Sequence, residues 1–158
     1  MAKIVSINIS QRKGIAKKPV KEWVLKEDYG LEGDAHSGGG DRQVSLLAME
    51  SIQKQQLAMD NKQIEKCPKT RSSDVKLKPG DFAENITTEG IDLVGSDIGI
   101  RLIINEKVVL RISKIGKECH RFCSIYYKTG DCIMPREGIF AIVLNGGTIK
   151  AGDEIRVE

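Results

Sequence analysis

The sequence predicts a mainly β fold with a few helices, and three observations lead to that prediction. Ile, Val and Leu dominate the apolar residues while aromatic residues make up only 4%, and β-branched side chains favour strands. The 16 glycines indicate many turns. Only one segment has the apolar spacing of a helix. Many short strands with one helix favour a sheet that closes or folds over on itself.

The first part of the chain is expected to contain two strands and a long loop. Lys3–Ser10 is rich in apolar residues and predicts a strand, and residues 11–18 form a basic turn or loop. Val20–Leu25 predicts a second strand, which carries the only tryptophan, Trp23. Residues 29–41 contain closely spaced turn-forming residues and predict a long loop.

The middle of the chain is expected to contain the helix. Arg42–Leu47 predicts a short strand that leads into a helix over Ala48–Met59, where Met49 and Ile52 can share one face. Residues 61–79 are polar and are expected to form an exposed connection.

The second half of the chain predicts five further strands. They are Phe82–Thr87, Ile98–Ile104, Val108–Ile115, Ile139–Leu144 and Glu154–Val157. Asn105–Lys107 is the turn of an expected hairpin, and residues 145–147 and 151–153 are further turns.

Length and charge limit the classes of protein. A chain of 158 residues fits one domain, 1–158, with a single core. The net charge of +3 is too small to predict nucleic-acid binding. The sequence has no apolar run long enough for a membrane span and no signal-peptide core, so we expect no membrane association and a cytoplasmic location. Four cysteines in such a protein favour thiol chemistry or metal binding over disulfides.

Three of the cysteines lie in one segment with a histidine. These potential ligands are Cys119, His120, Cys123 and Cys132. One interpretation is a tetrahedral structural zinc site, although the spacing fits poorly because adjacent Cys119 and His120 would have to point at one ion. For Cys123 and Cys132, packing and a supporting redox role remain equally open, and Cys67 is expected to be an exposed thiol.

The other interpretation is a single reactive cysteine, Cys119, at the end of an expected strand. Lys117, Arg121 and His120 favour its thiolate, which is the form that binds soft metals or carries sulfur. A buried, inert thiol is the structural alternative.

The glycine-rich loop holds a second group of candidates. Asp34 and His36 are candidate ligands or general acid–base groups, and ordering of the loop by hydrogen bonds is an equally good role for them. Asp41 and Arg42 follow three consecutive glycines and are candidates for contact with an anion, because flexible glycines let backbone amides approach a phosphate. The spacing matches neither a Walker loop nor a dinucleotide fingerprint.

Several motifs occur together in one order along the chain. They are Gly-Asp-Ala-His (33–36), Asp-Arg-Gln-Val-Ser-Leu-Leu (41–47), Gly-Asp-Phe-Ala-Glu-Asn-Ile-Thr-Thr-Glu-Gly (80–90), Ile-Gly (98–99), Cys119 after a strand, Gly-Ile-Phe-Ala-Ile-Val-Leu-Asn-Gly-Gly (138–147) and Gly-Asp-Glu-Ile (152–155). Over nearly its whole length the chain resembles the MOSC domain, the C-terminal domain of molybdenum cofactor sulfurases, in its small stand-alone bacterial form.

The resemblance implies a β-barrel-like fold with a few helices and a site built on one cysteine. In family members that cysteine carries sulfur as a persulfide or binds molybdenum, and Cys119 matches its position. The cofactor-binding residues expected for this chain are Asp41, Arg42, Asn85, Lys117 and Arg121, with His36, His120, Cys123 and Cys132 in support. Lys117 and Arg121, which lie beside the cysteine in the sequence, would favour its thiolate and hold the pterin phosphate. The chain departs from some relatives at Ala83, where they have an arginine.

Three functions follow as hypotheses. The first is a molybdenum cofactor (molybdopterin) or sulfur-carrier binding protein of molybdenum cofactor metabolism, with a pyridoxal-phosphate cysteine desulfurase or a molybdopterin-synthesis protein as partner. The second is a molybdenum-dependent reductase of N-hydroxylated compounds that needs an external electron donor. The third is a zinc-stabilised interaction domain.

Overall fold

The computed structural model describes residues 2–12, 15–60, 76–116 and 133–158. Eight strands form one sheet in the order β11-β7-β8-β9-β5-β6-β1-β2, and three form a smaller sheet in the order β10-β3-β4. The strands are β1 (Lys3–Ile9), β2 (Lys18–Val20), β3 (Glu22–Lys26), β4 (Gly30–Leu31), β5 (Val44–Ala48), β6 (Ile86–Glu89), β7 (Arg101–Ile104), β8 (Val108–Ile115), β9 (Ile139–Asn145), β10 (Gly147–Lys150) and β11 (Ile155–Val157).

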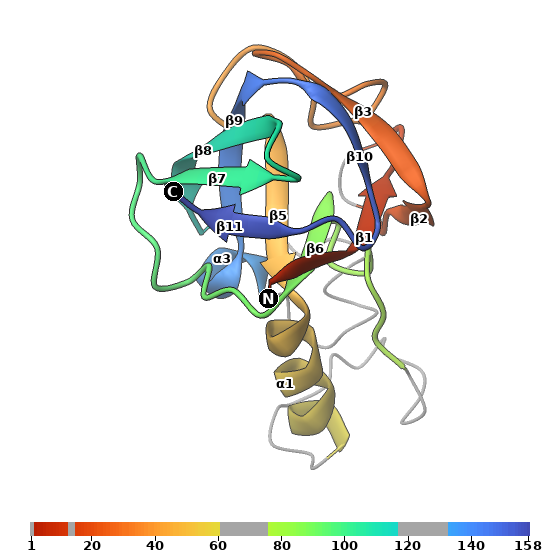
Figure 1. Ribbon diagram of the computed structural model, residues 1–158. Coiled ribbons are helices and arrows are strands. Elements are labelled where there is room, and N and C mark those ends of the chain that lie inside the picture. The colour runs from red at the N-terminus through yellow and green to blue at the C-terminus, as the bar shows by residue number, and fades with distance from the viewer. Residues whose placement is uncertain (1, 13–14, 61–75, 117–132) are drawn as a thin grey trace.

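The larger sheet curls until its two end regions meet (Figure 1). Lys3 of β1 forms an isolated antiparallel bridge with Glu154, immediately before β11, although the two strands lie near opposite ends of the sheet order. Two backbone hydrogen bonds hold this contact, from the N–H of Ile4 to Asp153 O at 2.8 Å and from the N–H of Ile155 to Ala2 O at 3.1 Å. The contact gives the sheet a barrel-like form, which confirms the predicted fold class.

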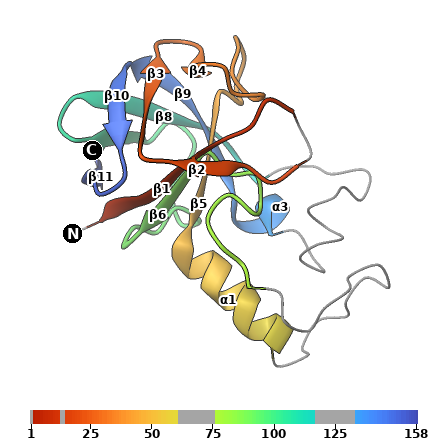
Figure 2. The same cartoon turned by 90° about the vertical axis from the view of Figure 1, so that its right-hand side faces the viewer.

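The helices of the described residues are few and short. Helix α1 (Met49–Asp60) follows β5 directly and extends away from the sheet, and α3 (Met134–Glu137) is a single turn (Figures 1 and 2). The helix predicted over Ala48–Met59 is therefore confirmed to within one residue at each end. Across the described part of the chain, no helix has both the length and the apolar character needed to cross a membrane.

The apolar core consists of two clusters. The larger one is made almost entirely of Ile, Val and Leu side chains from both sheets, as the scarcity of aromatic residues predicts. The smaller one lies where α1, α3 and the turn before β6 meet, and it contains Phe82 and Phe140. Full burial of such side chains stabilises the fold by about 1.5 to 3 kcal/mol each. Phe140 also reaches the candidate site, so that site is built directly on the smaller cluster.

Several strand boundaries differ from the prediction. The strand expected over Phe82–Thr87 begins at Ile86, because Gly80 and Ala83 take left-handed backbone conformations with φ of 91° and 62°. The strand expected over Val20–Leu25 is two strands, β2 and β3, that pair with different partners. A turn was expected at residues 145–147, but Gly147 already begins β10, which pairs with β3. These pairings depend on partners far away in the sequence.

Candidate functional site

The candidate site centres on the loop between β4 and β5, which we call the glycine loop (residues 33–42). Its backbone bends at Gly38 and Gly40, whose φ angles of 139° and 133° favour glycine. A Cβ atom added at either glycine, or at Gly39, would meet no atom of the described residues within 4 Å. Protein packing therefore leaves the glycine backbone open, and a bound group could approach it closely.

Asp34 anchors the start of the glycine loop. Its carboxylate accepts hydrogen bonds from Lys17 Nζ at 2.9 Å, from the N–H of Ser10 at 2.9 Å and from the N–H of His36 at 2.9 Å. Burial alone would raise the pKa of Asp34, but these donors outweigh burial and hold the pKa below its usual value. Asp34 is therefore an ionised structural centre, and the loop-ordering role considered for it is the one that the contacts support.

Gln43 anchors the end of the glycine loop. Its side-chain Nε2 donates to Asp28 Oδ1 at 2.8 Å and to Gly40 O at 3.1 Å. Its Oε1 accepts from the N–H of Val143 in β9 at 3.0 Å. This buried side chain fixes Gly40 against the large sheet. The sequence prediction missed Gln43, for which the only signal was a polar residue directly before an apolar run.

A hollow of about 280 Å³, which we call the loop hollow, lies along the glycine loop. Its lining residues are His36, Ser37, Gly38, Gly39, Gly40, Asp41, Arg42 and Phe140. Its size is close to the lower end of the range for small-molecule pockets. The structure thus brings together three of the predicted site residues, His36, Asp41 and Arg42, around one hollow.

Arg42 supplies the positive charge of the loop hollow. Its guanidinium carbon lies 5.6 Å from the centre of the Phe140 ring, a cation–π arrangement that holds the planar group in place. Asp41 is exposed, and its backbone carbonyl accepts a hydrogen bond from Ser113 Oγ of β8. His36 is mostly buried, with Nδ1 3.8 Å from Asp34 Oδ2. A fixed guanidinium beside open glycine amides is an arrangement suited to a phosphate or carboxylate.

Asn85 lies elsewhere, in a buried polar network under the sheet. Its Oδ1 accepts from the N–H of Ser45 at 2.9 Å, and its Nδ2 donates to Asn8 O at 3.3 Å. Asn85 is fully buried and does not line the loop hollow. Its amide therefore joins the ends of β1, β5 and β6, and any effect on the site passes through the position of these strands.

Glu84 belongs to the same network and was missed by the sequence prediction. Its Oε2 accepts from Thr87 Oγ1 at 2.7 Å and its Oε1 from the N–H of Phe82 at 3.3 Å. Complete burial outweighs these donors and raises the pKa of Glu84 to about 7. The buried carboxyl group of Glu84 therefore gains or loses its proton near neutral pH.

The predicted cysteine site lies outside the described residues. This applies to Lys117, Cys119, His120, Arg121, Cys123 and Cys132, and also to Cys67. The zinc alternative depends entirely on residues of this group. Within the residues that the structure does describe, no three His, Cys, Asp or Glu side chains are grouped so that they could hold a metal ion.

The strand that leads to Cys119, β8, pairs with β9, which contributes Phe140 to the loop hollow. Lys114 of β8 is the register partner of Phe140, which lines the hollow. Two residues later, the N–H of Gly116 donates to Gly138 O at 2.7 Å. Cys119 follows Gly116 by three residues, a reach of at most about 11 Å along an extended chain.

The comparison with known families matches most of this chain. The model of the MOSC domain matches residues 33–156, which include the glycine loop, the turn before β6 and the Cys119 segment. Among curated proteins, none matches this sequence significantly.

Several solved structures of bacterial proteins have the same fold. The YuaD protein from Bacillus subtilis superposes with a TM-score of 0.72 at 20% identity, covering 99% of this chain and 94% of that one. YiiM from Geobacillus stearothermophilus gives 0.69 at 18% identity, covering 100% and 75%. YiiM from Escherichia coli gives 0.64 at 17% identity, covering 99% and 69%. At these identities the similarity establishes the fold alone.

Proposed function

The chain belongs to the MOSC domain family, whose model spans residues 33–156, and from that premise we propose that it binds the molybdenum cofactor through the glycine loop and Cys119. A function related to the molybdenum cofactor follows from the family itself. The finer proposal is that Cys119 either ligates the molybdenum or carries sulfur as a persulfide for this cofactor.

The observation that carries the proposal is the position of Arg42. Its guanidinium is stacked on Phe140 at the loop hollow, and Phe140 pairs in register with Lys114 of the strand that leads to Cys119. The anion-binding group lies just before β5 and the segment with the candidate thiol follows β8, and these two strands flank β9, which carries Phe140. Such a pair suits a ligand with a phosphate at one end and a thiophilic metal at the other.

The described residues fit the anionic part of the cofactor. The backbone at Gly38, Gly39 and Gly40 is open to a bound group, and Arg42 offers a planar set of donors for a phosphate. Among the described residues that line the loop hollow there is no cysteine or methionine. A soft ligand for molybdenum would therefore come from Cys119, next to Lys117 and Arg121, which favour its thiolate.

Different residues of this chain would bind the phosphate and order the glycine loop. Arg42 and the glycine amides hold the phosphate, while Asp34 and Gln43 keep the loop in its bound form. The cofactor, when bound, supplies a molybdenum centre for redox and sulfur chemistry. As a sulfur carrier, the Cys119 thiolate attacks the outer sulfur of a desulfurase persulfide, forming a new S–S bond while the old one breaks and the desulfurase thiolate leaves.

Two measurements test this proposal. The full chain is purified from a host that makes the molybdenum cofactor, and bound pterin is measured after oxidation to its fluorescent form; close to one pterin per chain is expected, and none would contradict cofactor binding. Separately, the chain is incubated with a cysteine desulfurase and cysteine. A gain of one sulfur atom at Cys119 by mass spectrometry supports the carrier role, and an unmodified Cys119 contradicts it.

A further inference from the structure

A second hollow, of about 680 Å³, lies on the outer side of the N-terminal strands and is larger than the loop hollow. We call it the outer hollow. Its walls come from the end of β1, from described residues of the loop between β1 and β2, from β2, from Trp23 of β3 and from residues 32–33. Among the described residues, it shares no lining residue with the loop hollow. Figure 2 shows β2 and β3 following one another around a bend on this face. The volume lies within the range of small-molecule pockets.

The body of the outer hollow is apolar. Ile9, Val20 and Trp23 are partly buried and pack against the larger core cluster, so their inner sides are fixed. The indole N–H of Trp23 donates to Glu32 O at 2.7 Å, which fixes the orientation of the ring. A held indole ring beside aliphatic side chains offers a flat apolar wall on which an aromatic ring can stack.

The charge of the outer hollow is positive. Exposed Arg12 and Lys18 line it, and neither has an ion-pair partner among the residues that the structure describes. Its single acidic lining residue, Glu32, is paired with Lys26 at 3.3 Å. Two available cations next to an apolar wall complement a carboxylate or sulfonate attached to an apolar body.

The edge strand that forms one wall is unsuited to pairing with a strand of another protein. β2 is the last strand in the order of the large sheet, but it has only three residues and Pro19 is the middle one. Proline has no N–H to donate, and a short strand with proline protects a sheet edge from pairing. A small molecule therefore fits this face better than an added strand.

From these four features we propose that the outer hollow is a binding site for a small organic anion with a flat aromatic body. The aromatic body would stack against Trp23 and the aliphatic wall. The anionic group would lie between Arg12 and Lys18. This site is separate from the proposed cofactor site and requires neither the cofactor nor Cys119.

The test uses 2-naphthoate as the probe and 2-naphthylmethanol as a neutral molecule of the same shape. Trp23 is the only tryptophan of the chain, so its side-chain N–H gives one resonance in a ¹H–¹⁵N NMR spectrum. The full chain is made in a host without molybdenum cofactor, which keeps the result independent of the proposed function. We expect 2-naphthoate to shift this resonance saturably, and the neutral alcohol to bind at least tenfold more weakly.

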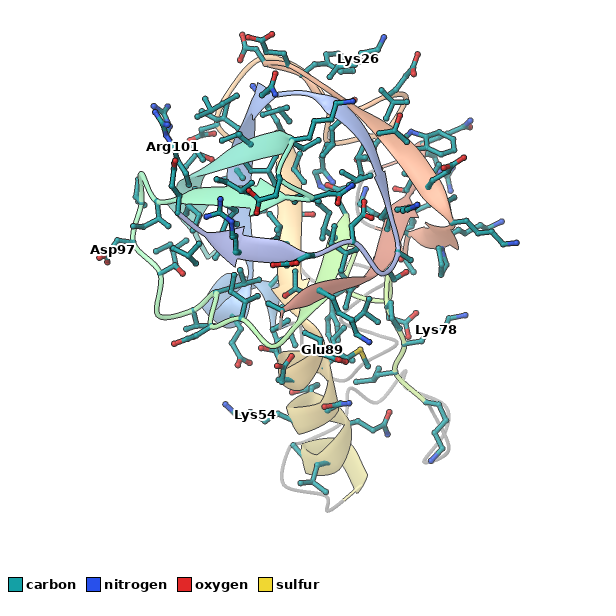
Figure 3. All side chains as sticks on the ribbon, viewed as in Figure 1. Lys26, Lys54, Lys78, Glu89, Asp97 and Arg101 are labelled. Carbon is teal, nitrogen blue, oxygen red and sulfur yellow. The ribbon has the colours of Figure 1, made fainter. Side chains whose placement is uncertain are left out.

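Charge-reversal variants locate the anionic group. Both cations are exposed, so Arg12→Glu with Lys18→Glu should leave the fold intact, as checked by the remaining resonances. This double variant should weaken 2-naphthoate binding at least tenfold. The control is Arg111→Ala, which removes an exposed cation of β8 whose register partner is Arg101; Figure 3 shows Arg101 on the opposite side of the molecule from β2 and β3. It should leave binding unchanged.

Three results would overturn the proposal. One is the absence of a saturable shift of the Trp23 resonance up to concentrations on the order of 5 mM, which corresponds to about 3 kcal/mol of binding free energy. Another is equal binding of the neutral alcohol. The third is unchanged 2-naphthoate binding in the charge-reversed double variant.

Discussion

The Nζ atom of Lys17 lies 2.9 Å from Oδ1 of Asp34, and neither side chain is exposed to solvent. The pair joins the N-terminal loop to the start of the glycine loop. Lys17 also donates its backbone N–H to Gly80 O at 2.8 Å, which links the pair to the turn before β6. Three segments that are distant in the sequence therefore meet at one buried ion pair.

Replacing Lys17 with Met should destabilise the protein by about 3 to 5 kcal/mol, because it leaves the buried carboxylate of Asp34 without its charged partner. Denaturant unfolding measures the loss. In the same variant the pKa of Asp34 should rise, since burial is then opposed by fewer donors. The matched control is Lys26→Ala, which removes the exposed pair with Glu32 and should cost at most about 1 kcal/mol. Equal losses in the two variants would contradict the anchoring role.

Glu84 should make stability fall as the pH rises. Its pKa is about 7 in the folded protein, against 4.5 for the ordinary group. Between pH 4.5 and about pH 7, the folded state keeps the proton of Glu84 and the unfolded state has lost it. The contribution of the protonated group to the free energy of unfolding is therefore complete below pH 4.5 and is lost as the pH rises to about 7.

The expected loss from this group is roughly 2 to 3 kcal/mol between about pH 5 and pH 8. Glu84→Gln, which keeps the shape but cannot ionise, should flatten that part of the curve. Unfolding free energies of both proteins across this range provide the test. If the unfolding free energy of Glu84→Gln falls with pH as steeply as that of the wild type, other groups cause the pH dependence.

Gly80 should not tolerate a side chain. Its φ of 91° is left-handed, and an added Cβ would collide with the backbone carbonyl of Lys17. Gly80→Ala is expected to cost about 2 to 4 kcal/mol, from the conformation and the overpacking together. Gly152 has a similar φ of 96° but open space around it, so Gly152→Ala reports the conformational part alone, about 1 kcal/mol. If both variants lose the same stability, the contact with Lys17 is not what requires glycine.

Arg42 should control retention of the anionic end of the cofactor. Arg42→Ala removes a charge-assisted contact worth about 1.5 to 3 kcal/mol, which corresponds to roughly 10- to 100-fold weaker binding. Arg42→Lys keeps the charge but not the planar stack on Phe140, so it should restore binding only in part. Pterin retained after dialysis measures the effect. If Arg42→Ala retains as much pterin as the wild type, the loop hollow is not part of the cofactor site.

The sequence predicted the fold where local pattern decides it. Val108–Ile115 forms a strand with the predicted bounds, and it is preceded by a hairpin turn in which Asn105 and Glu106 take left-handed conformations with φ of 52° and 58°. The strand β10 was missed because its pairing with β3 joins segments more than a hundred residues apart. Periodicity within one segment does not reveal such partners.

The candidate site was predictable only in part, for the same reason. Glycines next to Asp41 and Arg42 indicated an anion site, and the loop hollow lies there. Gln43 and Glu84 were missed because their importance comes from burial and from contacts with distant partners, such as that between Gln43 and Val143. A charged or polar residue inside a short apolar segment was the available signal.

If Cys119 is the one cysteine that serves this site, the molybdenum content of the purified chain depends on it. Wild type, Cys119→Ser and the control Cys67→Ser are made in a host competent for the cofactor, and molybdenum per chain is measured with folding checked by circular dichroism. We predict that wild type and Cys67→Ser retain the same molybdenum, and that Cys119→Ser loses nearly all of it while remaining folded. A Cys119→Ser protein with the full molybdenum content would contradict ligation of the molybdenum by Cys119.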